Sequence, residues 1–288
     1  MPHPTQAIHR QYHQANLSAK LLDALARAGK DPDALTRDDL IPFDEFHAGG
    51  RAATRELARL AALQAGTQAL DLGCGVGGAA RTLAAEFGCR VTGLDIVPAY
   101  CQAAEMLTAR VGLSDRVTYH HGDAVAPPFK DGSFDVVWSQ HTLMNVADKG
   151  RLFRQVRRVL RPGGRFALHT ICAGPTGPPH FPLPWADEPS ISFLVDPEKL
   201  RRLLRAAAFH ERVWRDVSAE TLEWFRRAAA RQATRGADAP PPLGMHLLMG
   251  ENTVAKLANL QRDLQEERVR VVQAVLAAPV QRAGEHPP

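Results

Sequence analysis

Cysteine is scarce in this sequence, dense basic runs and long apolar runs are absent, and each of these features excludes a class of protein. The four cysteines, at positions 74, 89, 101 and 172, are irregularly spaced. They form neither a disulfide framework nor a paired zinc-ligand spacing, so a reducing compartment is expected. The 35 basic and 31 acidic residues are interleaved and leave a formal net charge of +4. This pattern is typical of a solvated surface and argues against nucleic-acid binding.

No apolar run reaches the length of a membrane span, and the polar opening MPHPTQAIHRQYHQ lacks the apolar core of a signal peptide. The sequence therefore predicts a cytoplasmic protein that binds neither membrane nor nucleic acid. With 45% hydrophobic residues, the 288-residue chain can fill a sizeable core. Its oligomeric state is left open, and a homo-oligomer is compatible with the sequence.

Strand-like and helical patterns alternate from about residue 52, which predicts an α/β fold with a doubly wound, mostly parallel, seven-stranded sheet. Strands are expected at 69–72, 90–94, 117–120, 134–138, 165–171, 212–217 and 269–275. Helices are expected near 17–25 with Asn16 as its cap, 52–62, 81–87, from Pro98, at 152–160, and at 197–207 with Asp196 as its cap.

The same patterns suggest how the chain is divided. We expect an N-terminal helical arm at 1–45, a Rossmann-like core at 46–217, a helical cap insertion at 218–265, the last core strand within 266–280 and a flexible tail at 281–288. A break in the cap is expected at 239–242. Residues 173–195 are rich in proline and glycine and predict a long loop, which is uncommon in a compact domain unless it has a function.

A glycine-rich turn, Gly73-Cys74-Gly75-Val76-Gly77-Gly78, follows the first predicted strand. Glycines at such a turn let the backbone approach a ligand, and the next helix offers free N–H groups to it. The turn also fits the G-x-G-x-x-G pattern of nicotinamide dinucleotide sites, so by itself it does not identify the cofactor.

Three features favour S-adenosylmethionine over a nicotinamide cofactor. Asp71 stands where nicotinamide enzymes usually keep an apolar residue, and the pattern resembles the D-x-G-x-G-x-G motif of class I methyltransferases. Asp95, followed by Ile96, ends the second strand in a position to bind ribose hydroxyls, which either cofactor would require. Asp123 and Ala124, after the third strand, look like the adenine-binding loop of methyltransferases.

Other segments point to a narrower resemblance. Residues 44–54, DEFHAGGRAAT, are similar to a motif that precedes the first strand in small-molecule methyltransferases, and 138–141, WSQH, resembles the sarcosine and dimethylglycine N-methyltransferase-like group. Segments 184–186, 189–195, 244–250 and 268–275 are similar to that group too. The resemblance implies cofactor contacts from Gly49, Gly50, Asp71, Gly73, Gly75, Asp95, Ile96, Asp123, Ala124 and Gln140. It also implies that His141 faces the transferred methyl group.

S-adenosylmethionine supplies its own reactive methyl group, so the protein has to align the acceptor and exclude water. A general base is needed only for a protonated acceptor. His141 is the first candidate, with the alternative that it orients a loop or the cofactor carboxylate, and His47 is the second. The neighbouring His120 and His121 should point to opposite faces of a strand, so no metal site is expected.

Candidate substrate-binding residues are His141, Asn145, Trp185, Met245 and His246, although tryptophan and methionine could equally be core. An arginine such as Arg51 or Arg215 could hold an acceptor carboxylate. The predicted reaction is methyl transfer to a small molecule, preferably at an amine nitrogen, with oxygen and carbon open. A nucleic-acid methyltransferase is a second hypothesis. Against it, the fourth strand is followed by Ser139-Gln140-His141 and not by the N-P-P-Y type motif of amino-methylating enzymes. A nicotinamide-dependent oxidoreductase and a non-catalytic cofactor sensor remain alternatives.

Overall fold

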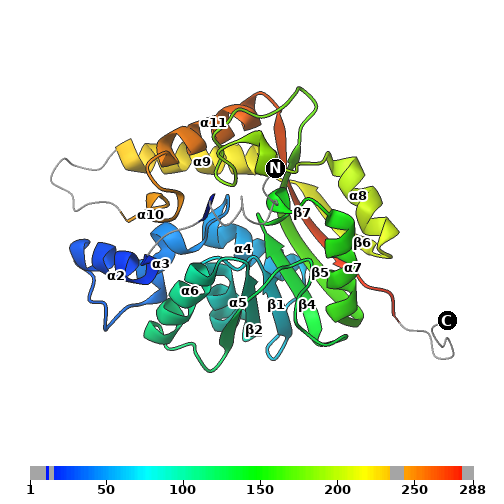
Figure 1. Cartoon of the computed structure of the whole chain (residues 1–288), viewed down its shortest axis with the longest axis horizontal. Helices are drawn as coiled ribbons and strands as arrows, with labels where there is room; N and C mark the ends of the chain where they lie inside the picture. The colour runs from blue at the N-terminus through cyan, green and yellow to red at the C-terminus, as the bar shows by residue number, and fades with distance from the viewer. Residues whose placement is uncertain (1–10, 13–15, 234–242, 281–288) are drawn as a thin grey trace.

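A seven-stranded sheet covered by helices on both faces forms the centre of the protein (Figure 1). The structure is a computed structural model and describes residues 11–12, 16–233 and 243–280. The strands are β1 (Gln68–Leu72), β2 (Arg90–Asp95), β3 (Val117–His121), β4 (Phe134–Gln140), β5 (Leu160–Ala173), β6 (His210–Asp216) and β7 (Val269–Ala277). Their order is β3-β2-β1-β4-β5-β7-β6, with β7 antiparallel to both of its neighbours and all other pairs parallel. The predicted fold class is confirmed.

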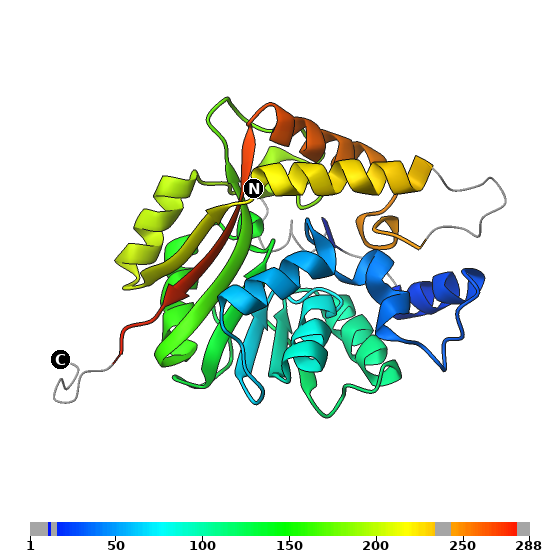
Figure 2. The same ribbon diagram turned by 180° about the vertical axis from the view of Figure 1, so that it is seen from behind.

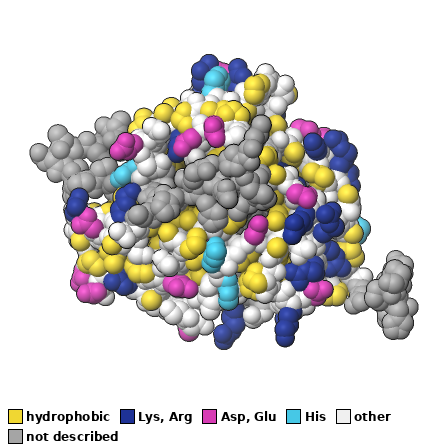
Figure 3. Space-filling model, in the orientation of Figure 1, with side chains coloured by type: hydrophobic (Ala, Val, Ile, Leu, Met, Phe, Trp, Pro, Cys, Tyr) yellow, Lys and Arg dark blue, Asp and Glu magenta, His cyan; other side chains and the backbone are white. Residues whose placement is uncertain are grey.

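The two faces of the sheet bury separate apolar clusters, because successive residues of a strand point to opposite sides. On one face Leu70 and Leu72 pack in the same cluster as α7 (Lys149–Val159) and α8 (Pro197–Ala206). On the other face Ala69 packs in a cluster with α4 (Gly50–Leu60), α5 (Gly78–Phe87) and α6 (Pro98–Arg110). The arginines of α7 face outward, and basic side chains gather on the side where α7 and α8 lie (Figure 3).

One helix cap was predicted correctly and one was not. Asp196 accepts a hydrogen bond from the Lys199 N–H at 2.7 Å and caps α8 as expected. Asn16 precedes α2 (Leu17–Arg27), but its backbone is left-handed, with φ at 54°, and its side chain makes no cap bond. An N-cap side chain reaches the first turn from extended backbone, so the prediction for Asn16 was wrong. Burial of one leucine face stabilises α2 instead.

A second helix in the N-terminal arm, α3 (Arg37–Asp44), was not predicted from the sequence. It has only eight residues and contains Pro42, so it shows little helical periodicity. Its start is fixed by a reciprocal capping box between Thr36 and Asp39. The arm packs on the core, because α2 and α6 share an apolar cluster that also contains Phe43 of α3.

Three helices lie between β6 and β7 in the sequence, namely α9 (Ser218–Ala233), α10 (His246–Met249) and α11 (Thr253–Gln265). Helices α9 and α11 run side by side, across from α2, α3 and α4 (Figures 1 and 2). The loop that follows β5 contains a short 3-10 helix, η2 (Pro189–Ile191). The predicted break at 239–242 and the predicted tail at 281–288 fall outside the described residues. No helix in the described ranges is long and apolar enough to cross a membrane.

Candidate active site

A cavity of about 1490 Å³ opens at the carboxyl ends of β1, β2 and β4. Pockets for a single small ligand usually measure roughly 300 to 1,000 Å³, so this one has room for a cofactor and a second molecule. Apart from Arg215, the predicted site residues lie in its wall: His47, Gly49, Gly50, Arg51, Asp71, Gly73, Gly75, Asp95, Ile96, Asp123, Ala124, Gln140, His141, Asn145, Trp185, Met245 and His246. The fold therefore brings this predicted set together, and the role of each residue stays a prediction.

The glycine turn after β1 is shaped for close approach of a ligand. Gly73 has a φ of +73°, and a side chain there would overlap the Thr142 hydroxyl. Gly75 has a φ of +54° and faces open space where a Cβ would stand. Both conformations favour glycine. Helix α5 begins directly after the turn, so its free N–H groups lie at the same edge of the cavity.

Asp71 places an unpartnered carboxylate oxygen in the cavity wall. The residue is 2% exposed, and its Oδ2 has no hydrogen-bond partner among the described residues. Burial, together with the smaller effect of the nearby carboxylates of Asp95 and Glu45, raises the pKa of Asp71 to about 8. A buried acceptor without a donor is costly unless a ligand supplies one. The α-ammonium group of S-adenosylmethionine has the hydrogen-bond donors and the positive charge that this oxygen lacks.

Two further carboxylates follow β2 and β3 at the same edge of the sheet. Asp95 accepts hydrogen bonds from the Gly75 N–H at 2.8 Å and the Val97 N–H at 2.9 Å. These bonds fix the carboxylate in the wall, where its remaining lone pairs suit ribose hydroxyls. Asp123 accepts from the Val125 N–H at 3.0 Å and stands beside Ala124, as an adenine-binding loop requires. The three loops together fit S-adenosylmethionine.

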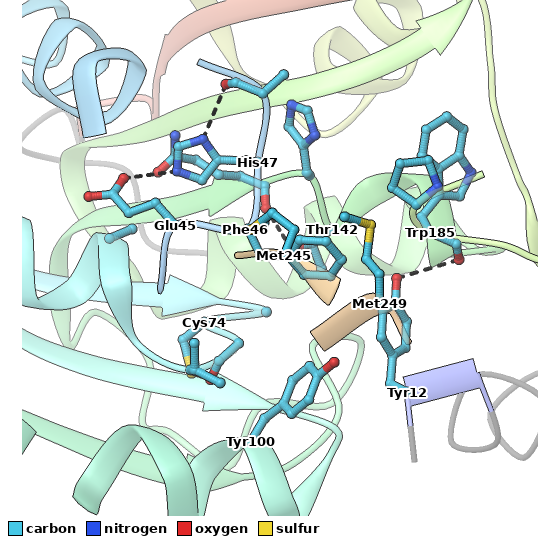
Figure 4. Close-up of a pocket in the computed structure, with 18 of the residues that line it drawn as sticks. Tyr12, Glu45, Phe46, His47, Cys74, Tyr100, Thr142, Trp185, Met245 and Met249 are labelled. Atoms are coloured by element: carbon cyan, nitrogen blue, oxygen red, sulfur yellow. Dashed lines mark hydrogen bonds and ion pairs between the residues drawn. The ribbon is translucent and has the colours of Figure 1, made fainter. Parts of the chain in front are cut away.

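A buried polar network borders the cavity from the N-terminal side, around Glu45 (Figure 4). Glu45 Oε2 accepts from the Thr54 hydroxyl at 2.5 Å and lies 3.1 Å from His47 Nε2. Glu45 Oε1 accepts from the Thr82 hydroxyl at 2.7 Å and lies 3.7 Å from Arg51 Nε. Although burial acts to raise it, these bonds hold the pKa of Glu45 below its usual value. The carboxylate is therefore ionised and fully engaged within the protein.

Three histidine rings meet beside this network. The ring centroids of His141 and His169 are 4.6 Å apart, and the ring of His47 lies 6.0 and 5.8 Å from them. Burial lowers the pKa of both His141 and His169 well below 6.5, so both rings are neutral at pH 7. The Nε2 atoms of both rings lack a hydrogen-bond partner. Of these two, only His141 lies in the cavity wall, and it is held in left-handed backbone with φ at 51°.

Sequence reasoning missed His169 and the role of Glu45. His169 lies in the middle of β5, within a run that reads as an ordinary buried strand. Its register with Gln140 on β4 brings it to the site, and register is a property of the folded sheet. Glu45 stood in the DEFHAGGRAAT motif, but only the folded arm shows its four polar neighbours.

Asn145 does not offer a free side chain to a ligand. Its Nδ2 donates to the carbonyl oxygens of Trp185 and Ile191 at 2.8 and 3.0 Å. Its Oδ1 accepts from the Tyr12 hydroxyl at 2.8 Å. Asn145 therefore ties the N-terminal arm and the loop after β5 to the segment after β4. Gln140 is similarly engaged, because its Oε1 accepts from Trp138 Nε1 at 2.8 Å.

The two arginines predicted to hold an acceptor carboxylate, Arg51 and Arg215, are already paired with carboxylates of the protein. Arg215 pairs with Glu56 at 2.8 Å and does not lie in the cavity wall. Arg51 lies in the wall, but its guanidinium pairs with Asp38 at 2.7 Å and with Glu45.

Comparison with known proteins identifies the class. Residues 70–168 match the family model of the methyltransferase domain. Tocopherol O-methyltransferase of Arabidopsis thaliana is 37% identical over 103 residues, which are 36% of this chain and 30% of that protein. The 27-O-demethylrifamycin SV methyltransferase of Amycolatopsis mediterranei is 40% identical over 128 residues, 43% of this chain and 47% of that protein. The chain spans less than half the length of either curated relative.

Solved structures align with a larger share of the chain than these curated relatives do. The [4+2]-cyclase SpnF has a TM-score of 0.65 and 25% identity, covering 97% of this chain and 98% of that one. A provisionally assigned sarcosine dimethylglycine methyltransferase from Galdieria sulphuraria has a TM-score of 0.62 and 22% identity, covering 78% and 83%. With the sheet order, these findings show that the chain has the class I methyltransferase fold and that residues 70–168 match the methyltransferase domain, as the sequence predicted.

Proposed function

We propose that this protein transfers the methyl group of S-adenosylmethionine to a small-molecule acceptor. The observation that carries the proposal is the set of carboxylates of Asp71, Asp95 and Asp123, which lie at or just after the carboxyl ends of three adjacent strands and line one cavity. Methyltransferase relatives identical at 37 to 40% over part of the chain support it. The sequence favoured an amine nitrogen as the acceptor, and oxygen and carbon acceptors fit the same reaction.

When bound, the cofactor supplies an electrophilic methyl group and a neutral thioether leaving group. Asp71 would hold its methionine end, Asp95 its ribose and the loop of Asp123 its adenine. Helices α9, α10 and α11 contribute the opposite wall of the cavity and act as a cap that keeps water from the reacting atoms. Alignment of this kind can lower the free energy of activation by up to roughly 7 to 11 kcal/mol.

His141 is the proposed base for an acceptor that must lose a proton. It lies in the cavity wall, its ring is neutral, and its Nε2 has no hydrogen-bond partner in the part of the chain that the structure describes. A neutral imidazole can accept a proton from an acceptor held within hydrogen-bond distance. His47 is less free, because its Nε2 lies 3.1 Å from Glu45.

A labelled-methyl transfer screen over amines, amino acids, phenols and sterol-like or polyketide acceptors tests the proposal. Transfer of label to any acceptor class supports it. Cofactor binding alone is not sufficient, since one structural neighbour is a cyclase. Tight binding of NADH in place of S-adenosylmethionine would refute the cofactor assignment.

Replacing Asp95 should weaken cofactor binding. We expect Asp95→Ala to lose about 1 to 3 kcal/mol of S-adenosylmethionine affinity, because the ribose hydroxyls would be buried without an acceptor. Isothermal titration calorimetry measures the change. Glu251→Ala is the matched control, because Glu251 is an exposed acidic residue of the same cavity wall. Equal affinities for the wild type and Asp95→Ala would contradict the ribose assignment.

The raised pKa of Asp71 predicts a pH-dependent affinity. Below pH 8 the free site holds Asp71 mostly protonated, and an ammonium ligand requires the ionised form. The affinity for S-adenosylmethionine should therefore rise between pH 6 and 7.5, by at most about tenfold per pH unit, with proton release. Calorimetry in two buffers of different ionisation enthalpy measures both the affinity and the number of protons released. Asp71→Asn should remove the slope and Asp148→Asn, at an exposed wall position, should keep it. A slope unchanged in Asp71→Asn would argue against this pairing.

A further inference from the structure

Two parts of the cavity wall differ sharply in charge. The part built by residues 41–151 contains all the buried carboxylates described above. The N-terminal arm adds Tyr12 and the exposed Lys20 to the wall. Another part comes from β5, the loop after it and helices α9 to α11, and we call it the acceptor chamber. Its described lining residues are Ile171, Pro184, Trp185, Trp224, Phe225, Ala228, Leu243, Gly244, Met245, His246, Met249, Gly250, Glu251, Thr253, Val254, Leu257 and Leu260. Among them, Glu251 is the one acidic residue and is exposed, and neither lysine nor arginine occurs.

Next to the acceptor chamber, in the part of the wall built by residues 41–151, the charged side chains of Glu45 and Arg51 are already paired. Glu45 has four polar neighbours, and Arg51 is shared between Asp38 and Glu45. A cationic or phosphorylated acceptor would therefore enter an apolar space without a counter-charge. An unpaired charge buried in such a space is expensive.

The cavity wall also contains two exposed apolar side chains, in addition to exposed charged ones such as Lys20, Asp148 and Glu251. Ile41 of α3 is 48% exposed and Val254 of α11 is 80% exposed, and both lie in the cavity wall. They are two of the three large hydrophobic side chains that the described part of the chain exposes. Inside, Met249, Tyr12 and Trp185 gather at the end away from Glu45 and His47 (Figure 4). A path lined by such side chains favours an apolar ligand.

We propose that the acceptor is a large apolar molecule that carries no charge and presents a hydroxyl group to His141. This inference rests on the proposed methyl transfer and names its substrate class. A hydroxyl group is uncharged at neutral pH, whereas an aliphatic amine is cationic. The hydroxyl oxygen bonds to the methyl carbon as the carbon–sulfur bond breaks. The electron pair of the broken bond stays on sulfur. The hydroxyl proton passes to His141 Nε2 and then to solvent.

A matched series of ligands tests the charge preference. The probes are 4-nonylphenol, 4-nonylbenzylamine and 4-nonylphenyl phosphate, which share an apolar body and differ in charge. Binding to the full chain is followed by tryptophan fluorescence with S-adenosylhomocysteine present, and labelled-methyl transfer is measured in parallel. We expect the phenol to bind at least about tenfold more tightly than either charged probe and to be the one methylated. Equal or tighter binding of a charged probe overturns the inference, as does failure of all three to bind.

Two variants connect that result to the acceptor chamber. Trp224→Ala should weaken 4-nonylphenol binding several-fold and leave S-adenosylhomocysteine affinity unchanged, because Trp224 lies in the acceptor chamber. Val280→Ala, the third exposed hydrophobic residue, lies outside the wall and should change neither. Unchanged phenol affinity in Trp224→Ala overturns the location. If the wild-type protein did not bind S-adenosylmethionine, the proposed function itself would be refuted. Calorimetry with the cofactor alone, without the probes, measures that binding separately.

Discussion

His141→Asn is expected to lower the methyl-transfer turnover rate by roughly 10² to 10⁴-fold, the usual contribution of a positioned base. Asparagine tolerates left-handed backbone better than most residues, so it suits the φ of 51° at this position. It can form hydrogen bonds but cannot accept a proton at neutral pH. The expected loss is therefore in turnover, with S-adenosylmethionine affinity unchanged within about twofold.

Single-turnover kinetics and calorimetry on the same preparation separate the two quantities. His210→Asn is the matched control, because His210 is an exposed histidine that lies outside the cavity wall and should retain the wild-type rate. A turnover rate for His141→Asn equal to that of the wild type would assign His141 to loop orientation. A fall in cofactor affinity as large as the fall in rate would place it at the cofactor carboxylate.

Glu45→Ala is expected to lower the free energy of unfolding by about 3 to 5 kcal/mol, the usual cost of breaking a buried charge pair from one side. Removal of the carboxylate takes an acceptor from Thr54, Thr82 and His47. It also leaves Arg51 with one carboxylate partner. Urea denaturation at constant pH measures the loss.

Asp38→Ala is the control for Glu45→Ala, because it removes the other carboxylate that pairs with Arg51. The side chain of Asp38 is 82% exposed, whereas that of Glu45 is 2% exposed. An exposed ion pair contributes less than about 1 kcal/mol, so this variant should be nearly as stable as the wild type. If the two variants lost equal stability, the buried network would not be the reason for the cost.

The sequence predicted the residues of the candidate site better than their contacts. Asp71, Asp95 and Asp123 lie at or just after the carboxyl ends of three strands. The carboxyl ends of parallel strands meet at one edge of the sheet, so the pattern alone brings them together. Asn145 was predicted to bind substrate, yet its amide is used within the protein. No sequence pattern specifies which atoms of a side chain stay free after folding.

Features that depend on packing between distant segments could not be predicted. Tyr12 reaches Asn145 across 133 residues, and His169 reaches His141 through the pairing of β4 with β5. The short helix α3 carries too few residues for a periodic pattern. The charge division of the cavity wall likewise appears only when α9 to α11 are placed opposite the glycine turn, and it shifts our preferred acceptor from an amine to a hydroxyl.

The position of β7 between β5 and β6 has a consequence for folding during synthesis. Strand β6 pairs with β7 and with no other strand in the described residues, so it emerges from the ribosome about 50 residues before its only partner. Until then β5 has an unpaired edge as well. The final strand therefore joins two edges at once, and a chain truncated before residue 269 should expose both and aggregate.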